Sequence, residues 1–301
     1  MPELPEVETI ARGVNERLHG DRIVEVWFGR YREPFKTLPA RQARGLEGRP
    51  ILAVHRTGKH IVCELGSAGE SQSHPSGKNK SAARVGHPGH GLHEAENKPA
   101  AQWIVHLGMT GRLLVTTPEA PVAAHTHARL VLASGRELRF VDPRRFGRLE
   151  FRDLSRASGF NAPGADPLDV TAEEFVQLFH PHRMAIKAAL LNQTLLSGVG
   201  NIYADESLFR AGIRPRRLCG RLTRAELERL RVALSDVLEN SIRLGGSSVN
   251  DYVDADGVRG FFQLEHCVYL RTGLACLRCL TPIRRIVLAG RGTHYCPHCQ
   301  V

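Results

Sequence analysis

The sequence predicts an α+β protein of two domains, in which a helix and a β-rich region precede a helical region. The 301 residues are enough for two domains of ordinary size. Short apolar runs separated by turn residues fill positions 22–151, which is typical of strands, whereas helical periodicity returns from position 171. We interpret residues 156–170, where neither pattern holds, as the linker between the two domains.

The composition favours a polyanionic partner and a reducing compartment. The net charge is +10 and the pI is about 9.6, a balance typical of proteins that bind nucleic acid or acidic surfaces. The sequence contains no apolar run long enough to predict a membrane span. Its acidic amino terminus lacks the apolar core of a secretory signal. The seven cysteines do not suggest a disulfide framework, so we expect a cytoplasmic protein.

The first element is predicted to be an amphipathic helix that stops at Gly20. Its apolar residues recur at helical spacing and are Val7, Ile10, Ala11, Val14 and Leu18. Glu6 and Glu8 lie in its first turn, where acidic side chains favour a helix start. Pro2 and Glu3 therefore precede a helix amino terminus, whose dipole disfavours a protonated amine.

Pro2 is a candidate nucleophile. A small residue after the initiator usually allows Met1 to be removed, which leaves a secondary amine beside the Glu3 carboxylate. A terminal amine has a pKa of about 8, so part of it is unprotonated at neutral pH and can attack an electrophilic carbon. The alternative is that Pro2 and Pro5 only shape an extended approach to the helix. On these residues alone, the structural alternative is favoured.

The β-rich region predicts a sandwich or a barrel. Its clearest strand-like runs are residues 23–28, 51–54, 61–63, 103–105 and 130–132. Residues 66–101 interrupt it with a stretch rich in Ser, Gly, His, Lys, Asn and Pro that has no periodicity. We interpret this stretch as a flexible insertion between two strands.

The second half is predicted to be mainly helical. Residues 171–174 and 223–226 are capping boxes, and the second begins a long helix that Gly245 and Gly246 end. Two shorter helices are expected over about 184–191 and 202–210. The polar, glycine-containing residues 245–260 are a candidate mobile lid.

Four cysteines near the carboxyl end predict one structural zinc site. Two close pairs with sixteen residues between them are formed by Cys276, Cys279, Cys296 and Cys299. Each pair can supply two corners of a tetrahedron, and four thiolates leave no open position for catalysis. The alternatives are two disulfides, which a reducing compartment disfavours, and a redox pair, which the doubled motif disfavours. We expect His294 and His298 at the surface rather than among the ligands.

Several sequence blocks, in a fixed order, match those of a known family. They are residues 2–8 (PELPEVE), 106–111 (HLGMTG), 142–147 (DPRRFG), 186–187 (IK), 198–206 (GVGNIYADE) and 291–300 (RGTHYCPHCQ). With them the chain resembles the bacterial formamidopyrimidine-DNA glycosylases, base-excision repair enzymes that remove oxidised purines. The resemblance implies an N-terminal helix on a β-sandwich, a helix-two-turns-helix domain and a C-terminal zinc-ribbon β-hairpin. It places them at residues 1–155, 171–263 and 264–301, with DNA between the domains.

The resemblance also implies the catalytic residues. Pro2 would attack C1′ of the damaged nucleotide and form a Schiff base that undergoes β- and then δ-elimination, and Glu3 would act as the general acid. Lys59 and Arg291 match the residues that contact phosphates beside the target nucleotide. Glu6 matches a second carboxylate near the site, and we group it with the DNA-binding residues; the alternative is an ordinary helix N-terminal charge.

Four further residues match positions that bind DNA around an extruded base. Met109, Arg144 and Phe146 would fill the hole in the duplex, and Arg144 would bind the orphaned cytosine. Their placement in glycine-bounded loops indicates exposure rather than burial in the core. Asn201, at a predicted helix start, would bind phosphate; an ordinary N-cap is compatible with that role.

The expected protein is thus a monomeric enzyme that holds one Zn²⁺ and acts on double-stranded DNA with oxidised bases or abasic sites. Two alternatives remain, an endonuclease VIII-like glycosylase for oxidised pyrimidines and a non-catalytic zinc-ribbon DNA-binding protein. The Leu4 and DPRRFG signatures favour the purine enzyme. The chain departs from the family pattern in the 66–101 insertion, in Leu280, where glycine is common, and in GADPL at residues 164–168.

Overall fold

A computed structural model describes residues 2–69, 98–249 and 252–301. Most of the insertion expected over 66–101, and two residues of the candidate lid over 245–260, lie outside this range. The strands on either side of the insertion end at Leu65 and begin at Ala101, as neighbours in one sheet. No helix among the described residues is long and apolar enough to cross a membrane.

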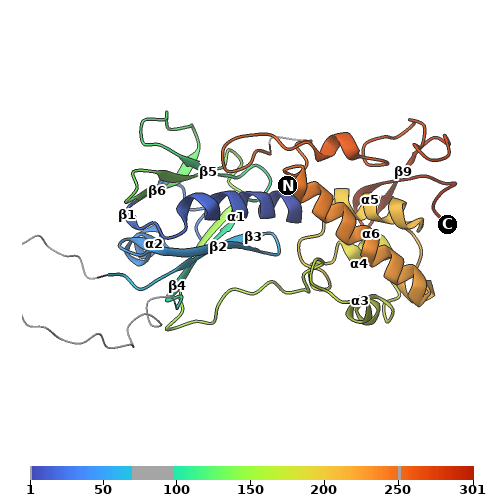
Figure 1. Ribbon diagram of the computed structural model, residues 1–301, viewed down its shortest axis with the longest axis horizontal. Helices are drawn as coiled ribbons and strands as arrows, with labels where there is room; N and C mark the ends of the chain where they lie inside the picture. Colours follow the sequence, from blue (N-terminus) through green and yellow to red (C-terminus); the bar gives the residue numbers. More distant parts are fainter. Residues whose placement is uncertain (1, 70–97, 250–251) are drawn as a thin grey trace, which may run out of the picture.

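Helix α1 (Leu4–Leu18) joins the two halves of the molecule. The helix starts earlier than its apolar periodicity indicates, because Glu3 and Glu6 form a capping box around its first turn. Residues from Val7 onward pack in the core of the β-rich half, whereas Leu4 packs in the core of the helical half. Figure 1 accordingly shows α1 running from the sandwich to the helical half, with its amino end beside α6 (Arg224–Arg243).

The β-rich half is a sandwich, which decides between the two predicted architectures. One antiparallel sheet has the order β2 (Ile51–Thr57), β3 (His60–Leu65), β4 (Ala101–His106) and β8 (Arg148–Asp153). The other has the order β1 (Ile23–Phe28), β6 (Thr126–Leu132), β7 (Glu137–Val141) and β5 (Arg112–Thr116). Trp103 and Phe140 fill the core between them.

One helix in this half was not predicted. Helix α2 (Pro39–Leu46) buries only Gln42 and Leu46, so it has no apolar periodicity to read. Pro39 occupies its first turn, where the missing N–H costs nothing. Gln42 holds the helix to the sandwich, because its Oε1 accepts a 3.1 Å hydrogen bond from the Trp103 indole N–H.

The helical half contains the predicted capping boxes. Its helices are α3 (Ala172–Phe179), α4 (Ile186–Leu190), α5 (Asn201–Ala211), α6 and the short 3₁₀ helices η1 (Cys219–Arg221) and η2 (Phe262–Glu265). Thr171 and Thr223 cap α3 and α6 as expected. The expected border between residues 263 and 264 falls inside η2, since Phe262 belongs to the helical core.

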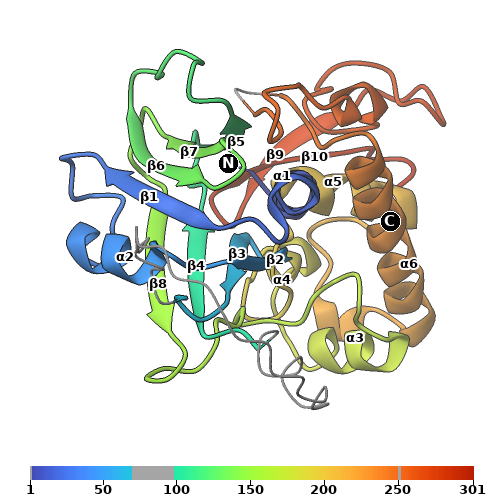
Figure 2. The same ribbon diagram turned by 60° about the vertical axis from the view of Figure 1, so that its left-hand side comes forward.

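A two-stranded hairpin of β9 (Arg284–Leu288) and β10 (Arg291–Tyr295) follows at the carboxyl end. The hairpin lies beside α5 in Figure 2, and the residues after it are tied to the end of that helix. Val301 N–H donates to Gly212 O at 3.1 Å, and the Arg214 guanidinium donates to Gln300 O at 3.1 Å. The hairpin is therefore packed on the helical half rather than free of it.

Candidate active site and metal centre

A small pocket of ≈ 80 Å³ lies where the two halves meet, and we call it the amino-terminal pocket. It is lined by Pro2, Glu3, Glu6, Met109, Ile202, Ser247, Val249, Tyr252 and Tyr269. These residues come from the start of α1, the β4–β5 connection, α5 and the segments that flank η2. The pocket thus surrounds the adjacent residues Pro2 and Glu3, the predicted amine and its predicted acid, with residues from both halves.

The position of Pro2 and Glu3 is fixed by one main-chain hydrogen bond to the helical half and by one bond to a side chain of α1. The Leu4 N–H donates to Gly198 O at 3.0 Å, and the Glu3 N–H donates to Glu6 Oε2 at 2.8 Å. Because the first bond reaches the turn before α5, the dipeptide is held by the helical half as well as by its own helix.

Glu3 is a buried carboxyl with one oxygen free. It is 7% exposed, and its Oε2 has no hydrogen-bond partner among the described residues. Burial raises the pKa of Glu3 to about 7, with the positive charge of Lys59 opposing the shift. A Cβ on Gly200 would lie 2.0 Å from the Glu3 carboxyl carbon, so only glycine leaves room for this acid. Glu3 can therefore hold or release a proton near neutral pH.

Glu6 is buried and lines the amino-terminal pocket, and its predicted role in DNA binding stays a prediction. It is 2% exposed, and its Oε1 accepts hydrogen bonds from the Tyr203 hydroxyl and, at 2.8 Å, from Ser247 N–H. Its Oε2 holds the Glu3 N–H. Burial raises its pKa. Glu6 therefore connects the reactive dipeptide to α5 and to the start of the 245–260 loop.

Lys59 lies on the β2–β3 turn and faces the same group of charges. Gly58, the residue before it, has φ +61°. A Cβ on Gly58 would lie 3.2 Å from Ala162 and 3.3 Å from Ser197, so the turn packs closely against these residues. Burial lowers the pKa of Lys59, while the Glu3 carboxylate raises it and Arg291 lowers it further. The four residues predicted to be catalytic are thus electrostatic neighbours.

Met109, Arg144 and Phe146 form one exposed tip, as predicted. Met109 is 44% exposed and Phe146 is 49% exposed, and the Arg144 guanidinium lies 4.8 Å from the Phe146 ring centroid. Asp142 joins the two loops that carry them, since its carboxylate accepts from Thr110 Oγ1 at 2.6 Å and from Gly147 N–H at 2.8 Å. Apolar side chains held outward on such a tip are suited to enter a base stack.

Asn201 begins α5, but Gly200 is the N-cap, which corrects the expected capping role. Its side-chain Nδ2 donates to Gly292 O at 3.0 Å. Arg291, the residue before Gly292, is exposed at the start of β10. Asn201 is therefore attached to the hairpin that carries Arg291, and the amino end of α5 remains an anion site through its main-chain amides.

The four predicted metal ligands lie together at the carboxyl end. Their ligand atoms all lie within 4.8 Å of one another, as a tetrahedral thiolate site requires, and are those of Cys276, Cys279, Cys296 and Cys299. The Cys279–Cys296 and Cys276–Cys299 sulfur separations are 3.4 and 3.9 Å, beyond the roughly 2.05 Å of a disulfide. Hydrogen bonding to Thr281 lowers the pKa of Cys279 to about 6, which favours the thiolate that a metal binds.

His294 is not a surface residue, which corrects another expectation. It is 4% exposed, its N–H and Nδ1 lie 2.9 and 3.1 Å from Asp205 Oδ2, and it takes no part in the cysteine cluster. Five residues of the pocket wall were not among the predicted site residues, namely Ile202, Ser247, Val249, Tyr252 and Tyr269. Ile202 lies in the matched block 198–206, and three of the others lie in the candidate lid over 245–260, so only Tyr269 lies outside every segment that the sequence singled out.

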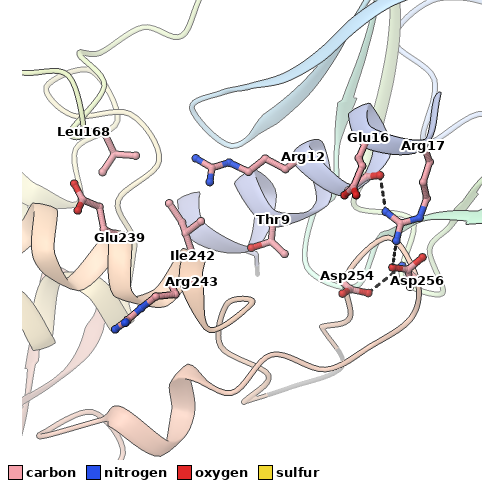
Figure 3. Close-up of a pocket in the computed structure, with 11 residues that line it drawn as sticks. Thr9, Arg12, Glu16, Arg17, Leu168, Glu239, Ile242, Arg243, Asp254 and Asp256 are labelled. Atoms are coloured by element: carbon pink, nitrogen blue, oxygen red, sulfur yellow. Dashed lines mark hydrogen bonds and ion pairs between the residues drawn. The ribbon is translucent and has the colours of Figure 1, made fainter. Parts of the chain in front are cut away.

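A larger cavity of ≈ 700 Å³ lies elsewhere, between α1, α6 and residues 254–256 (Figure 3). Arg17 there pairs with Asp256, and Arg12 pairs with Glu8 at 2.6 Å. The cavity contains none of the residues predicted to be catalytic. Pro2 and Glu3, two of the residues predicted to be catalytic, line the smaller amino-terminal pocket instead.

Three domain models match the chain in order. The formamidopyrimidine-DNA glycosylase N-terminal domain matches residues 1–149, and the formamidopyrimidine-DNA glycosylase H2TH domain matches residues 162–253. A zinc finger found in FPG and IleRS matches residues 273–301, which include the four clustered cysteines. The cysteine cluster is thus a zinc-finger site for one ion.

Known proteins resemble the chain over its whole length. A formamidopyrimidine-DNA glycosylase of Solibacter usitatus is 40% identical over 302 residues, which cover 100% of this chain and 99% of the relative. A mutant FPG of Lactococcus lactis, in complex with Fapy-dG containing DNA, has a TM-score of 0.81 at 30% identity, with 99% of both chains covered. Lactococcus lactis Fpg in complex with an abasic site containing DNA has a TM-score of 0.80 at 31% identity, again with 99% of both chains covered.

The curated relative and the domain models agree with the sandwich, the helical half and the cysteine hairpin described above. The chain belongs to the formamidopyrimidine-DNA glycosylase family.

Proposed function

We propose that Pro2 is the nucleophile of a bifunctional DNA glycosylase and lyase that removes oxidised purines, among them 8-oxoguanine and formamidopyrimidines. The observation that carries the proposal is the juxtaposition of Pro2 with Glu3, a buried acid whose pKa is raised to about 7, in one pocket between the two halves. The chain is a DNA glycosylase of base-excision repair by family, and the residue roles below are the proposal.

The proposed chemistry uses both residues of the dipeptide. After removal of Met1, the Pro2 nitrogen forms a bond to C1′ of an extruded nucleotide, and the bond from C1′ to the damaged base breaks. Glu3 donates its proton to the sugar ring oxygen, so that the ring opens and a Schiff base forms. β-Elimination and then δ-elimination release the two flanking phosphates and leave a one-nucleotide gap. Burial of Glu3 supports this role because it keeps the acid protonated near neutral pH.

The DNA contacts we propose come from both halves. Lys59 and Arg291 bind phosphates beside the target, and the amino end of α5 at Asn201 adds main-chain donors. Met109 and Phe146 occupy the gap that the extruded base leaves, and Arg144 binds the orphaned base. Glu6 takes the role of a positioning residue, because its carboxylate is occupied by Tyr203, Ser247 and Glu3.

We further propose a cytoplasmic monomer that acts on double-stranded DNA with oxidised bases or abasic sites, in keeping with the net charge of +10. The proposed domains are residues 1–155, 171–263 and 264–301, with a linker at 156–170. The proposed linker is supported by its neighbours, because β8 ends at Asp153 before it and α3 begins at Ala172 after it.

Borohydride trapping tests the proposal. Borohydride reduces a Schiff base to a stable amine, so the chain should become covalently attached to duplex DNA that holds 8-oxoguanine opposite cytosine. Pro2→Gly should lose most of the adduct, whereas the matched variant Pro5→Ala, which alters a proline of α1 outside the pocket lining, should keep it.

Absence of an adduct with the wild-type chain, when amino-terminal sequencing shows Pro2 exposed, would disprove the enzyme and favour a non-catalytic DNA-binding protein. Faster trapping on an oxidised pyrimidine than on 8-oxoguanine would instead indicate the endonuclease VIII-like alternative.

A further inference from the structure

A buried ion pair lies between the helical half and the hairpin, outside the amino-terminal pocket. Lys187 on α4 and Asp205 on α5 both have fully buried side chains, and Lys187 Nζ lies 2.6 Å from Asp205 Oδ1. Burial lowers the pKa of Lys187, and the Asp205 carboxylate opposes that shift. Nothing in the proposed chemistry uses these two charges. Their burial is costly, so the contacts they make need an explanation.

The Lys187 ammonium is bonded to the hairpin strand directly after Arg291. Its Nζ donates to Gly292 O at 3.1 Å and to Thr293 Oγ1 at 2.8 Å. Asn201 Nδ2 donates to the same Gly292 oxygen at 3.0 Å. One carbonyl therefore receives donors from two helices, and it belongs to the peptide group next to the Arg291–Gly292 bond.

Asp205 extends the attachment by one more residue along β10, to His294. Its second oxygen, Oδ2, accepts the His294 N–H at 2.9 Å and lies 3.1 Å from His294 Nδ1. Residues 292, 293 and 294 are thus all fixed to α4 or α5 by charged or amide groups. Arg291, by contrast, is exposed. The chain leaves its anchored segment at the residue that we propose to bind phosphate.

This arrangement is informative because a two-stranded hairpin has little stability of its own. The zinc site fixes the chain only before β9 and after β10, at residues 276–279 and 296–299. The tip, with Arg291 at the first position of β10, lies at the opposite end of both strands. A separate attachment close to the tip is therefore needed to hold the arginine in one place.

We propose that Lys187 is a positioning residue for Arg291: with Asp205 and Asn201 it fixes the hairpin tip so that the guanidinium is held ready for a DNA phosphate. The inference rests on the proposed function, in which Arg291 binds the backbone beside the target nucleotide. Lys187 itself does not touch the DNA. Its loss should therefore affect binding only through Arg291.

A double-mutant cycle on the full zinc-loaded chain tests this coupling. The change is Lys187→Met with Asp205→Asn, which removes both charges together and keeps an acceptor for His294. It is combined with Arg291→Ala, and affinity for a duplex that carries a stable abasic-site analogue is measured as a function of salt. Because one phosphate contact is worth a slope of about 0.9 in log K against log salt, each change should reduce the slope by about that amount.

The dissociation constant is expected to rise about tenfold for Lys187→Met with Asp205→Asn in the wild-type background, and about tenfold for Arg291→Ala alone, as for one charge-assisted hydrogen bond. The combined variant should be no weaker than Arg291→Ala alone. Lys187→Gln with Asp205→Asn should restore part of the affinity, because its amide can still donate to Gly292 O. Zinc content should stay at one ion per chain throughout.

A matched control separates positioning from loss of stability. Glu137→Gln weakens another buried pair, with Arg139 at 2.6 Å in β7, and should leave the salt slope unchanged. Additive losses in the cycle, or an unchanged salt slope in the Lys187 variants, would overturn the inference. If Arg291→Ala alone has no effect, the proposed role of Arg291 fails instead.

Discussion

The two chemical centres of this molecule are built in opposite ways. The zinc site takes all its ligands from residues 276–299, in two short turns at the base of one hairpin. The amino-terminal pocket takes its walls from positions as far apart as Pro2 and Tyr269. The zinc site depends on thiolates and a metal charge, whereas the pocket depends on a carboxyl kept neutral by burial. A centre of the first kind can be recognised from spacing alone, while one of the second kind exists only in the finished fold.

Removal of zinc should separate the two centres most sharply. Structural zinc contributes about 10–16 kcal/mol of binding free energy in zinc-finger peptides, so the metal-free hairpin should unfold and release Arg291. We expect DNA affinity, measured by fluorescence anisotropy, to fall on the order of a hundredfold. Trapping at high protein concentration should persist because the pocket contains no zinc ligand.

Cys279→Ser should reproduce the loss of zinc, and Cys267→Ser provides its matched control. Cys267 is a partly buried thiol outside the four-cysteine cluster, so its replacement should leave metal content and affinity unchanged. Full DNA affinity in protein shown to be free of metal would refute the assignment of the hairpin as a zinc-dependent element.

Glu3→Gln should damage the pocket and leave the zinc site intact. General acid catalysis usually contributes about 10²–10⁴-fold, so base release in single-turnover assays should slow by that range. DNA affinity and zinc content should change little, because Glu3 is buried and far in sequence from the hairpin. A variant that releases base at the wild-type rate would show that another group supplies the proton.

The stability of the chain should also record the buried acid. The pKa of Glu3 rises from 4.5 to about 7 on folding, so the folded state binds its proton more tightly than the unfolded state. Protonation of Glu3 therefore stabilises the folded state by about 3 kcal/mol. This stabilisation is fully present below pH 4.5 and is lost as the pH rises through 7. The free energy of unfolding of the wild type, relative to Glu3→Gln, should fall by that amount. A flat difference from pH 4 to 8 would exclude a buried, titrating Glu3.

The smallest predicted effect is at Leu280, which directly follows the zinc ligand Cys279. Leu280 has φ +62°, a left-handed conformation that glycine adopts without strain and leucine does not. Its side chain is 76% exposed, so little packing is lost on its removal. Leu280→Gly should therefore stabilise the hairpin by about 1 kcal/mol, seen as tighter retention of zinc against a chelator. Ala120→Gly, at an unrelated turn, should not change zinc retention.

The contrast also explains how far the sequence could be interpreted. The structure contains each of the features that local patterns predicted. These are the capping boxes at Thr171 and Thr223, the β-strands of the first half and the cysteine cluster. Helix α2 was missed because it buries only two residues and shows no period. The strand pattern alone predicted a sandwich or a barrel, because register between strands depends on packing, and the family resemblance predicted the sandwich that the structure contains.

The burial of His294 was mispredicted, and that of Glu6 was not foreseen, for one reason. Both are polar residues whose partners, Asp205 and Tyr203, lie far away in the sequence. Burial of such groups follows from long-range pairing, which a single sequence does not display. Asn201 shows the same limitation on a smaller scale, because its side chain is used by the hairpin rather than by its own helix.

The division of α1 between two cores has a consequence for synthesis. This helix precedes every other helix and strand of the described residues in the sequence, yet Leu4 packs among residues such as Val199 and Phe262 and bonds to Gly198. The start of the helix therefore cannot dock until translation has passed the residues of the helical core. Such a long-range contact forms late and slowly. The amino-terminal pocket, and with it the raised pKa of Glu3, therefore forms only after the helical half has been made.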